Sequence, residues 1–470
     1  MNSARMNQED FGLTLGRFAR ALTLESLPAP ALVAAKVNVF DTLACAVAGS
    51  SAPAVGEIHS LVAGWGGAPQ ATILAYGDKV PAHHAAWVNG TMAHARDYDD
   101  AHDTALLHAG VSVVPAALAA AELVGGVRGA DFLSAVAAGL EVICRLGVAT
   151  RISILESGFL YTSLFGYFGA TVAAARVLQL DAVQTANALG LAYSQVAGNH
   201  QVTRDAALAK RMQPGLAAMS ALMAVQLTRK GISGTIGTFD GTDGFLRVYL
   251  RDRVDDEVLR GGLGRQFEFT GLGYKAYPCC RFTHTAISAA LALRDSLGMS
   301  IDSVERVRVG MNRKGVEIVG SPLALRRAPS NTVQAQFSVP YTVAAALVDG
   351  GVTLAHFTDT AIVRQDLLAL AGKIEPYVDE TIERDFGSVM SPALVDVDLK
   401  NGATHRIRID IPPGHPSRPM SPAEFDAKAQ DCFRRAANPL HDGAARLRQQ
   451  VDSLETLDDV RILARILEPT

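Results

Sequence analysis

The stretch AGVSVVPAALAAAELVGGV, residues 109–127, has the strongest influence on the expected fold. It is the richest apolar stretch of the chain, but Pro115, Glu122 and several glycines and alanines make it a poor membrane-spanning segment. A buried helix is the better interpretation, since small side chains let neighbouring helices approach closely. The stretch therefore predicts a tightly packed helical core.

Similar helical windows follow one another from about residue 28 to about residue 230, and Gly or Pro separates most of them. Several are apolar on nearly all sides, which is typical of helices inside an all-helical domain. The windows are APALVAAKVNVFDTLACAVAG (29–49), GADFLSAVAAGLEVICRLG (129–147), FGATVAAARVLQL (168–180), LDAVQTANALGLAYSQVAG (180–198) and QPGLAAMSALMAVQLTRKG (213–231).

The pattern changes after residue 271. VERVRVGMN (304–312) alternates as a half-buried strand does, and LVDVDLKNGATHRIRIDIP (394–412) contains two such runs joined by Asn401-Gly402, a hairpin signature. Helical windows lie among these strands. We therefore expect a mainly-α protein, with a large all-helical domain formed by residues 1–267 and 413–470 and a smaller α+β domain formed by residues 268–412.

The composition excludes several classes of protein. The 470 residues are 49% hydrophobic and carry a formal net charge of −4, with Lys and Arg scattered along the chain. This pattern indicates a globular protein that binds small molecules, and neither nucleic acid nor a membrane. The first twenty residues contain no uninterrupted apolar run, so we expect a cytoplasmic protein. Five cysteines without CxxC spacing favour reduced thiols over disulfides or a zinc site.

The segment HARDYDDAHD (94–103) crowds three carboxylates, Asp97, Asp99 and Asp100, between two histidines, His94 and His102, and adds Asp103 directly after them. Like charges so close together cost stability unless a cation, a metal or a ligand offsets them. The segment is therefore either a solvated loop or helix cap, or part of a site. A divalent metal could use Asp97, Asp99, Asp100, Asp103, His102 and His108. However, the spacing fits neither an EF-hand nor HExxH, and we expect no metal.

Three further motifs carry polar groups in this apolar chain. KRMQPG places Lys210 and Arg211 at the start of an apolar helix, where an anion would offset them. FSVPYTVAAAL places Tyr341 at the head of another apolar helix. The third motif, GYKAYPCCRFTH, contains Lys275, Arg281 and His284.

Cations beside Asp, His and Tyr side chains suit a substrate that has several carboxylates and undergoes proton abstraction. Each motif also has a structural explanation. Lys210 and Arg211 could lie on the polar side of their helix, and Tyr341 could pack with its hydroxyl satisfied. The adjacent Cys279 and Cys280 are better explained as small buried residues than as nucleophiles or ligands.

Four stretches in this order resemble the MmgE/PrpD family: VNGTMAHARDYDDAH, KRMQPGLAAMSALMAVQLTRKGISG, GYKAYPCCRFTH and QFSVPYTVAAALVDG. The family includes 2-methylcitrate dehydratase, cis-aconitate decarboxylase and iminodisuccinate epimerase, and the resemblance covers nearly the whole chain. It implies that the smaller α+β domain is a lid, with an active site between the domains, and that the protein is a homodimer. It also implies catalysis without a metal or an organic cofactor.

The resemblance implies a role for individual residues. The family's catalytic Asp falls on Asp97, and its catalytic His falls on His108, with His102 as the alternative because the spacing from Asp97 is one residue longer than in the decarboxylase. The two active-site lysines fall on Lys210 and Lys275, and the tyrosine falls on Tyr341. The residues that we predict to bind substrate are Arg211, Arg281, His284 and His102.

The chain departs from the family pattern at three places. Ala101 stands where the decarboxylases have Thr, HAG (108–110) replaces His-Pro-Ser, and Gln213 replaces a histidine. These changes argue against a decarboxylase and weaken the assignment to 2-methylcitrate. We expect a cofactor-independent lyase for a small di- or tricarboxylate, most similar to 2-methylcitrate dehydratase. The alternatives are an epimerase of a small dicarboxylate and a cis-aconitate decarboxylase-like enzyme.

Overall fold

The computed structural model describes residues 9–297, 301–387 and 392–469. The chain forms two compact units. Unit 1 contains residues 1–95, 99–272 and 432–470, and unit 2 contains residues 96–98 and 273–431. The three residues 96–98 therefore belong to unit 2, although the chain on either side of them belongs to unit 1.

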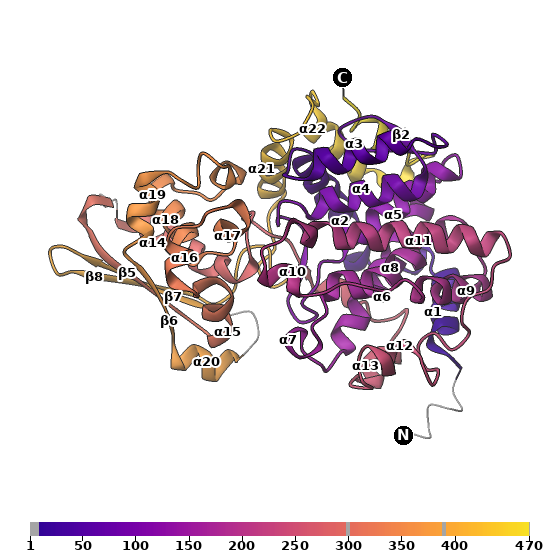
Figure 1. Cartoon of the computed structure of the whole chain (residues 1–470), viewed down its shortest axis with the longest axis horizontal. Helices are drawn as coiled ribbons and strands as arrows, with labels where there is room; N and C mark the ends of the chain where they lie inside the picture. Colours follow the sequence, from indigo (N-terminus) through magenta and orange to yellow (C-terminus); the bar gives the residue numbers. More distant parts are fainter. Residues whose placement is uncertain (1–8, 298–300, 388–391, 470) are drawn as a thin grey trace. The chain divides into compact units, whose positions relative to one another are not determined.

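Unit 1 is built from helices (Figure 1). Helix α11 lies at its centre, in contact with α4, α5, α8 and α9. A short antiparallel pair, β1 (Ala71–Thr72) and β2 (Lys79–Val80), lies beside them. The longer helices are α1 (Phe11–Ala21), α2 (Ala29–Gly49), α3 (Val55–Trp65), α4 (Ala82–His94), α5 (Gly110–Leu123), α6 (Gly129–Ala149), α8 (Tyr161–Val177), α9 (Ala182–Tyr193), α11 (Gln213–Arg229) and α22 (Gly443–Asp452).

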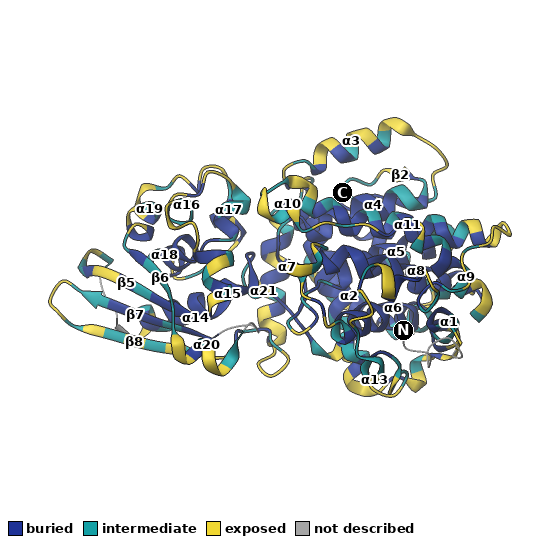
Figure 2. Cartoon of the chain, turned by 60° about the horizontal axis from the view of Figure 1, so that its bottom comes forward, coloured by how far each residue is buried: buried dark blue, intermediate teal, exposed yellow. Residues whose placement is uncertain are grey.

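Small residues set the spacing of these helices, as the sequence predicts. A methyl group added at Gly139 of α6 would lie 2.7 Å from the carbonyl oxygen of Gly169 of α8, and the converse distance is 2.8 Å. Neither position has room for a side chain, so the two backbones touch. The buried helix predicted within 109–127 is confirmed as α5, which contains Pro115. Figure 2 shows this helical core in the colour of buried residues.

Two helices, α2 and α6, are long and apolar enough to cross a membrane when they are judged by length and composition alone. In unit 1, however, 72% and 94% of their apolar windows are buried inside the protein. The core helix of a globular domain meets the same criteria. Both helices are therefore explained by their packing within unit 1.

Unit 2 contains a four-stranded sheet in the order β6-β5-β7-β8. Strand β5 pairs with β6 in parallel and with β7 antiparallel, and β7 pairs antiparallel with β8. Helix α14 contacts β7 and β8, while α18 contacts α14 and β6. The bounds are β5 (Val304–Met311), β6 (Ile374–Val378), β7 (Ala393–Leu399), β8 (Thr404–Ile409), α14 (His284–Leu297), α17 (Thr332–Gln336), α18 (Val339–Asp349), α19 (Gln365–Ala371), α20 (Glu380–Phe386) and α21 (Pro422–Phe433).

The mainly-α fold class with a smaller α+β part is confirmed, and so is the hairpin at Asn401-Gly402, where Gly402 has a φ of 88°. The predicted boundary at residue 413 differs from the structure, which keeps residues 413–431 in unit 2. The reason is the packing of α21, whose Phe425 lies 5.3 Å from the ring of Tyr274 and whose Lys428 donates to Tyr98 O. Residues 268–272, predicted in the smaller domain, belong to unit 1.

Candidate active site

His94, the last residue of α4, lies between a carboxylate and an ammonium group in unit 1. Its Nδ1 is 2.8 Å from Asp99 Oδ2, and its Nε2 is 3.1 Å from Lys210 Nζ. A carboxylate can only accept and an ammonium group can only donate. The imidazole must therefore carry its proton on Nδ1 and present Nε2 as an acceptor to Lys210.

The pKa values agree with this arrangement of protons. Burial, and then the positive charge of Lys210, lowers the pKa of His94 to about 4. Burial alone would favour the neutral form of Asp99, but His94 and then His108 beside it hold the pKa of that carboxyl well below its usual range. Near neutral pH, a buried carboxylate therefore faces a neutral imidazole.

His108 reaches the same carboxylate because the chain reverses between residues 102 and 107. His102 N donates to Leu107 O, and Leu106 has a φ of 54° in the left-handed region. His108 Nδ1 then lies 3.1 Å from Asp99 Oδ2 and 2.5 Å from Asp100 O, both of which are acceptors. Its proton is therefore on Nδ1, and Nε2 is the nitrogen that can accept a proton from a bound molecule. The His108 side chain is 20% exposed, against 1% for His94.

Asp100 has a structural role that explains part of the crowding of acids. Its carboxylate accepts hydrogen bonds from Ala109 N at 3.0 Å and Gly110 N at 2.9 Å, at the start of α5, and from Asn38 Nδ2 at 2.6 Å. Burial, and then the charge of Asp99, raises the pKa of Asp100 to about 6. Asp100 is therefore a helix cap, the structural alternative that the sequence leaves open for this segment.

His102 and Arg211 both hold backbone atoms in unit 1. His102 Nε2 lies 3.1 Å from Glu268 O, and its Nδ1 accepts from Ala105 N at 3.2 Å. Arg211 is buried, and its Nη1 donates to Pro53 O at 2.9 Å. The structure thus brings His108 and Lys210 to Asp99, and both ring nitrogens of His102 contact the backbone. The substrate-binding roles of His102 and Arg211 stay predictions.

In unit 2, Asp97 and Lys275 form a buried ion pair. Lys275 Nζ donates to Asp97 O at 3.0 Å and lies 3.2 Å from Asp97 Oδ2. The exposed fractions of the two residues are 1% for Lys275 and 5% for Asp97. Asp97 also has a φ of 53°, a strained conformation for a residue with a side chain, although Asp tolerates it better than most. Such strain is maintained only where surrounding contacts over-determine the backbone.

Arg281 and His284 are both buried, and they follow Lys275 closely in the sequence. Arg281 Nη1 donates to Pro413 O at 3.0 Å, and His284 Nε2 lies 3.3 Å from Cys279 O. Burial, and then the charges of Arg281 and Lys275, holds the pKa of His284 well below its usual range. His284 is therefore neutral, and the positive charge of this part of unit 2 comes from Arg281 and Lys275. The predicted substrate-binding roles of Arg281 and His284 stay predictions.

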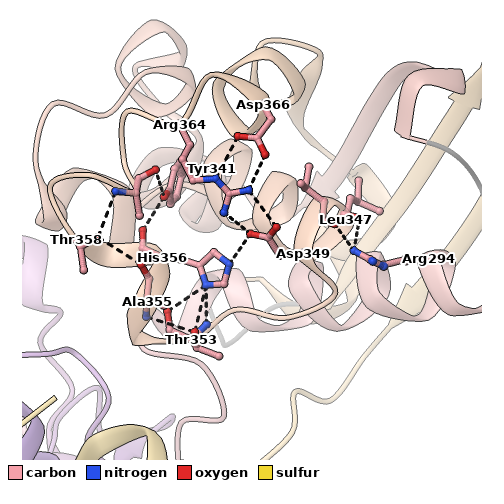
Figure 3. A network of polar contacts seen from close by, with 12 residues as sticks. Arg294, Tyr341, Leu347, Asp349, Thr353, Ala355, His356, Thr358, Arg364 and Asp366 are labelled. Carbon is pink, nitrogen blue, oxygen red and sulfur yellow. Dashed lines mark hydrogen bonds and ion pairs between the residues drawn. The ribbon is translucent and has the colours of Figure 1, made fainter. Parts of the chain in front are cut away.

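The hydroxyl of Tyr341 contacts backbone atoms of unit 2 (Figure 3). It donates to His356 O at 2.6 Å, and Ala361 O lies 3.2 Å away. The loop that carries these carbonyls is held by His356 Nε2, 2.9 Å from Asp349 Oδ2, and by Arg364, whose Nη1 is 2.7 Å from the same oxygen. Burial raises the pKa of Tyr341. These contacts suit a structural residue, and the catalytic role of Tyr341 stays a prediction.

One group among the described residues has metal-ligand character, namely His94, Asp99 and His108, whose ligand atoms lie within 4.8 Å of one another. Two features disfavour a cation there. Both imidazoles direct an N–H toward Asp99, and the ammonium group of Lys210 lies 3.1 Å from His94 Nε2, where it would repel a second cation. The larger metal set considered from the sequence is divided among separate roles, because Asp100 caps α5 and Asp97 pairs with Lys275.

Comparison with known proteins places most of the chain in one family. A family model of the MmgE/PrpD N-terminal domain matches residues 13–257, and one of the MmgE/PrpD C-terminal domain matches residues 277–458. The chain belongs to the MmgE/PrpD family. A cis-aconitate decarboxylase of Aspergillus terreus is 25% identical over 469 residues, which cover 96% of this chain and 94% of that protein. The human cis-aconitate decarboxylase is 27% identical over 401 residues, 83% of this chain and 80% of that protein.

Membership of the MmgE/PrpD family confirms the resemblance seen in the sequence, and at this coarse level it confirms an enzyme of the lyase class. The sequence prediction missed two residues of the cluster, His94 and Asp99. Both stand in the acidic segment, but only contact with Lys210 and His108 distinguishes them from their neighbours. The only signal for His94 in the sequence is its position at the start of the acidic segment.

Proposed function

We propose that this MmgE/PrpD protein is a lyase that acts on a small di- or tricarboxylate by moving a proton next to one of the carboxylates. The observation that carries the proposal is the cluster around Asp99, in which one buried carboxylate orients two imidazoles and one of these contacts the ammonium group of Lys210. The cluster combines a fixed cation with a partly exposed proton carrier. An anionic substrate that loses or gains a proton needs both.

Each group of the cluster has a chemical role in this proposal. The ammonium group of Lys210 neutralises a substrate carboxylate and the negative charge that develops on it when the neighbouring C–H bond breaks. His108 takes that proton on Nε2, because its Nδ1 is held by Asp99 and Asp100 O. The resulting imidazolium is stabilised by the carboxylate of Asp99. In a dehydration, the same proton can then protonate the departing hydroxyl group, which leaves as water.

An ion pair within unit 2 also enters the proposal. Asp97 is a proton-transfer group there, and Lys275 is its counter-ion at 3.2 Å. The identification of Asp97 as catalytic comes from the family resemblance, and the buried ion pair supports it.

For the reaction itself, we propose a hydro-lyase similar to 2-methylcitrate dehydratase. The support comes from departures from the decarboxylase pattern. Ala101 offers a methyl group where those enzymes have the hydroxyl of a Thr. A decarboxylase is the second candidate, because the curated relatives from Aspergillus terreus, human and mouse carry that name. An epimerase needs the same proton abstraction without a leaving group.

A single experiment separates these reactions. The purified, EDTA-treated protein is incubated in D₂O with 2-methylcitrate, citrate, cis-aconitate and iminodisuccinate, and the mixtures are followed by proton NMR. New olefinic signals from a saturated substrate would support the hydro-lyase. Release of CO₂ from cis-aconitate would identify a decarboxylase instead. Deuterium at the α-carbon of an otherwise unchanged substrate would overturn the lyase, and activity that returns only with a divalent ion would overturn the metal-free mechanism.

A further inference from the structure

The backbone of residues 96–98 is held by buried side chains of unit 2. Three successive carbonyl oxygens each accept from a different residue: Arg96 O from Gln336 Nε2 at 2.7 Å, Asp97 O from Lys275 Nζ at 3.0 Å, and Tyr98 O from Lys428 Nζ at 2.7 Å. The three donors are 2%, 1% and 4% exposed, respectively. Burying a charged lysine this fully costs free energy, so its charge must be well compensated. We therefore expect this arrangement to have a function.

Gln336, the last residue of α17, joins this segment to the one that carries Lys275. The side-chain Nε2 of Gln336 donates both to Arg96 O and, at 3.1 Å, to Pro278 O. The backbone carbonyl of Gln336 accepts from Cys280 N at 2.9 Å. One amide side chain thus fixes the distance between two stretches of chain that are far apart in the sequence. That distance determines how Asp97 is placed against Lys275.

Lys428 of α21 holds the other side of Asp97. Besides donating to Tyr98 O, its Nζ lies 4.4 Å from the centre of the Tyr98 ring, a cation–π contact. The hydroxyl of Tyr98 donates to Ala276 O at 3.3 Å, next to Lys275. Asp97 is therefore fixed from both neighbours, which accounts for the persistence of its left-handed φ of 53°.

From these contacts we propose that Gln336 and Lys428 are positioning residues that hold Asp97 in the strained conformation in which its carboxylate meets Lys275. The inference rests on the proposed function, in which Asp97 transfers a proton. Gln336 and Lys428 act through the backbone on either side of Asp97, so that the carboxylate does not have to be ordered when substrate binds.

The test compares Lys428→Met and Gln336→Leu with Lys373→Met, a matched control. Lys373 also donates its Nζ to a backbone carbonyl of unit 2, Val304 O at 2.7 Å, but far from residues 96–98 in the sequence. We expect hydrogen–deuterium exchange of the peptide spanning residues 95–100 to become at least about tenfold faster in the first two variants and to stay unchanged in the control. Lys428→Arg, which keeps a donor and a charge, should restore part of the protection.

The kinetic readout separates positioning from a general loss of stability. With the substrate that the NMR panel identifies, kcat should fall at least about tenfold in Lys428→Met, while KM changes by less than about threefold. Unchanged exchange, or faster exchange with an unchanged kcat, would overturn the inference. A wild-type protein that turns over none of the substrates would overturn the proposed function, and the exchange measurement would then decide alone whether Gln336 and Lys428 hold the segment.

Discussion

Asp99 Oδ2 lies 2.8 Å from His94 Nδ1, and both side chains are almost completely buried. The contact fixes the proton of the imidazole on Nδ1 and leaves Nε2 to the ammonium group of Lys210, 3.1 Å away. A buried carboxylate therefore determines, through the imidazole of His94, how the ammonium group of Lys210 is held.

Asp99→Asn should abolish most of the activity. The amide keeps the size of the side chain but replaces one acceptor by an N–H₂ group, which would face the N–H of an imidazole. We expect kcat/KM to fall by about 10²- to 10⁴-fold, the range for loss of general acid–base catalysis. The control is Asp181→Asn, at the N-cap of α9, where Asn is an equally good cap. Wild-type activity in Asp99→Asn would remove the cluster from the mechanism.

Lys210→Met should lose turnover without unfolding, because Lys210 is only partly buried and lies on the short η3 helix (Leu208–Met212). The variant should also raise the pKa of His94, since the charge of Lys210 is one cause of its low value. Activity is measured with the substrate from the NMR panel, and folding by thermal unfolding. Retained turnover would contradict the role of Lys210 as the carboxylate-binding cation.

His108→Ala and His102→Ala should have opposite effects. Loss of His108 should lower kcat by about 10²- to 10⁴-fold. Loss of His102 should leave kcat nearly unchanged but lower the free energy of unfolding by about 1–3 kcal/mol, because Glu268 O and Ala105 N each lose a buried partner. The opposite pair of results would assign catalysis to His102.

The pKa of His94 predicts how stability depends on pH. The pKa is about 4 in the folded protein, and it is 6.5 for a histidine outside the fold. Between pH 4 and pH 6.5, the unfolded chain therefore binds one proton more than the folded protein does. The contribution of His94 to stability is therefore complete above pH 6.5 and is lost as pH falls toward 4, by on the order of 3 kcal/mol. Chemical denaturation between pH 4.5 and 7.5 should show a steeper decline for the wild type than for His94→Gln. Parallel curves would contradict a neutral His94.

Tyr341→Phe separates the two explanations of that residue. The hydroxyl donates to His356 O, so the contacts predict a loss of about 1–2 kcal/mol in the free energy of unfolding and an unchanged kcat. The family resemblance predicts the reverse, a loss of kcat in a stable protein. Urea denaturation together with initial rates distinguishes the two outcomes.

The sequence was sufficient for features that depend on neighbouring residues. The apolar windows predicted the helices of unit 1, and Asn401-Gly402 predicted the hairpin between β7 and β8, because helical periodicity and turn chemistry are local properties. The boundary near residue 413 depends on what α21 packs against. Phe425 and Lys428 meet partners that are far away in the sequence, and no local pattern indicates them.

The same distinction applies to the candidate site. Composition singled out the acidic segment, and the family resemblance singled out Asp97 and Lys275, which the structure joins as an ion pair. The division of labour within the segment could not be predicted, since Asp99 and Asp100 are adjacent and chemically identical. One orients two imidazoles and the other caps α5, because the turn between residues 102 and 107 returns His108 to Asp99 and Gly110 to Asp100.

The close packing of unit 1 has a consequence for the synthesis of the protein. Helix α5 ends at Leu123, but α11, which covers it, is complete only at Arg229. At 5–20 residues per second, the ribosome needs roughly 5 to 20 s for those additional residues, and during that time the face of α5 that contacts α11 in the finished protein has no permanent cover. The nascent chain is therefore expected to depend on chaperones that shield apolar helices, and its yield should improve when translation is accompanied by them.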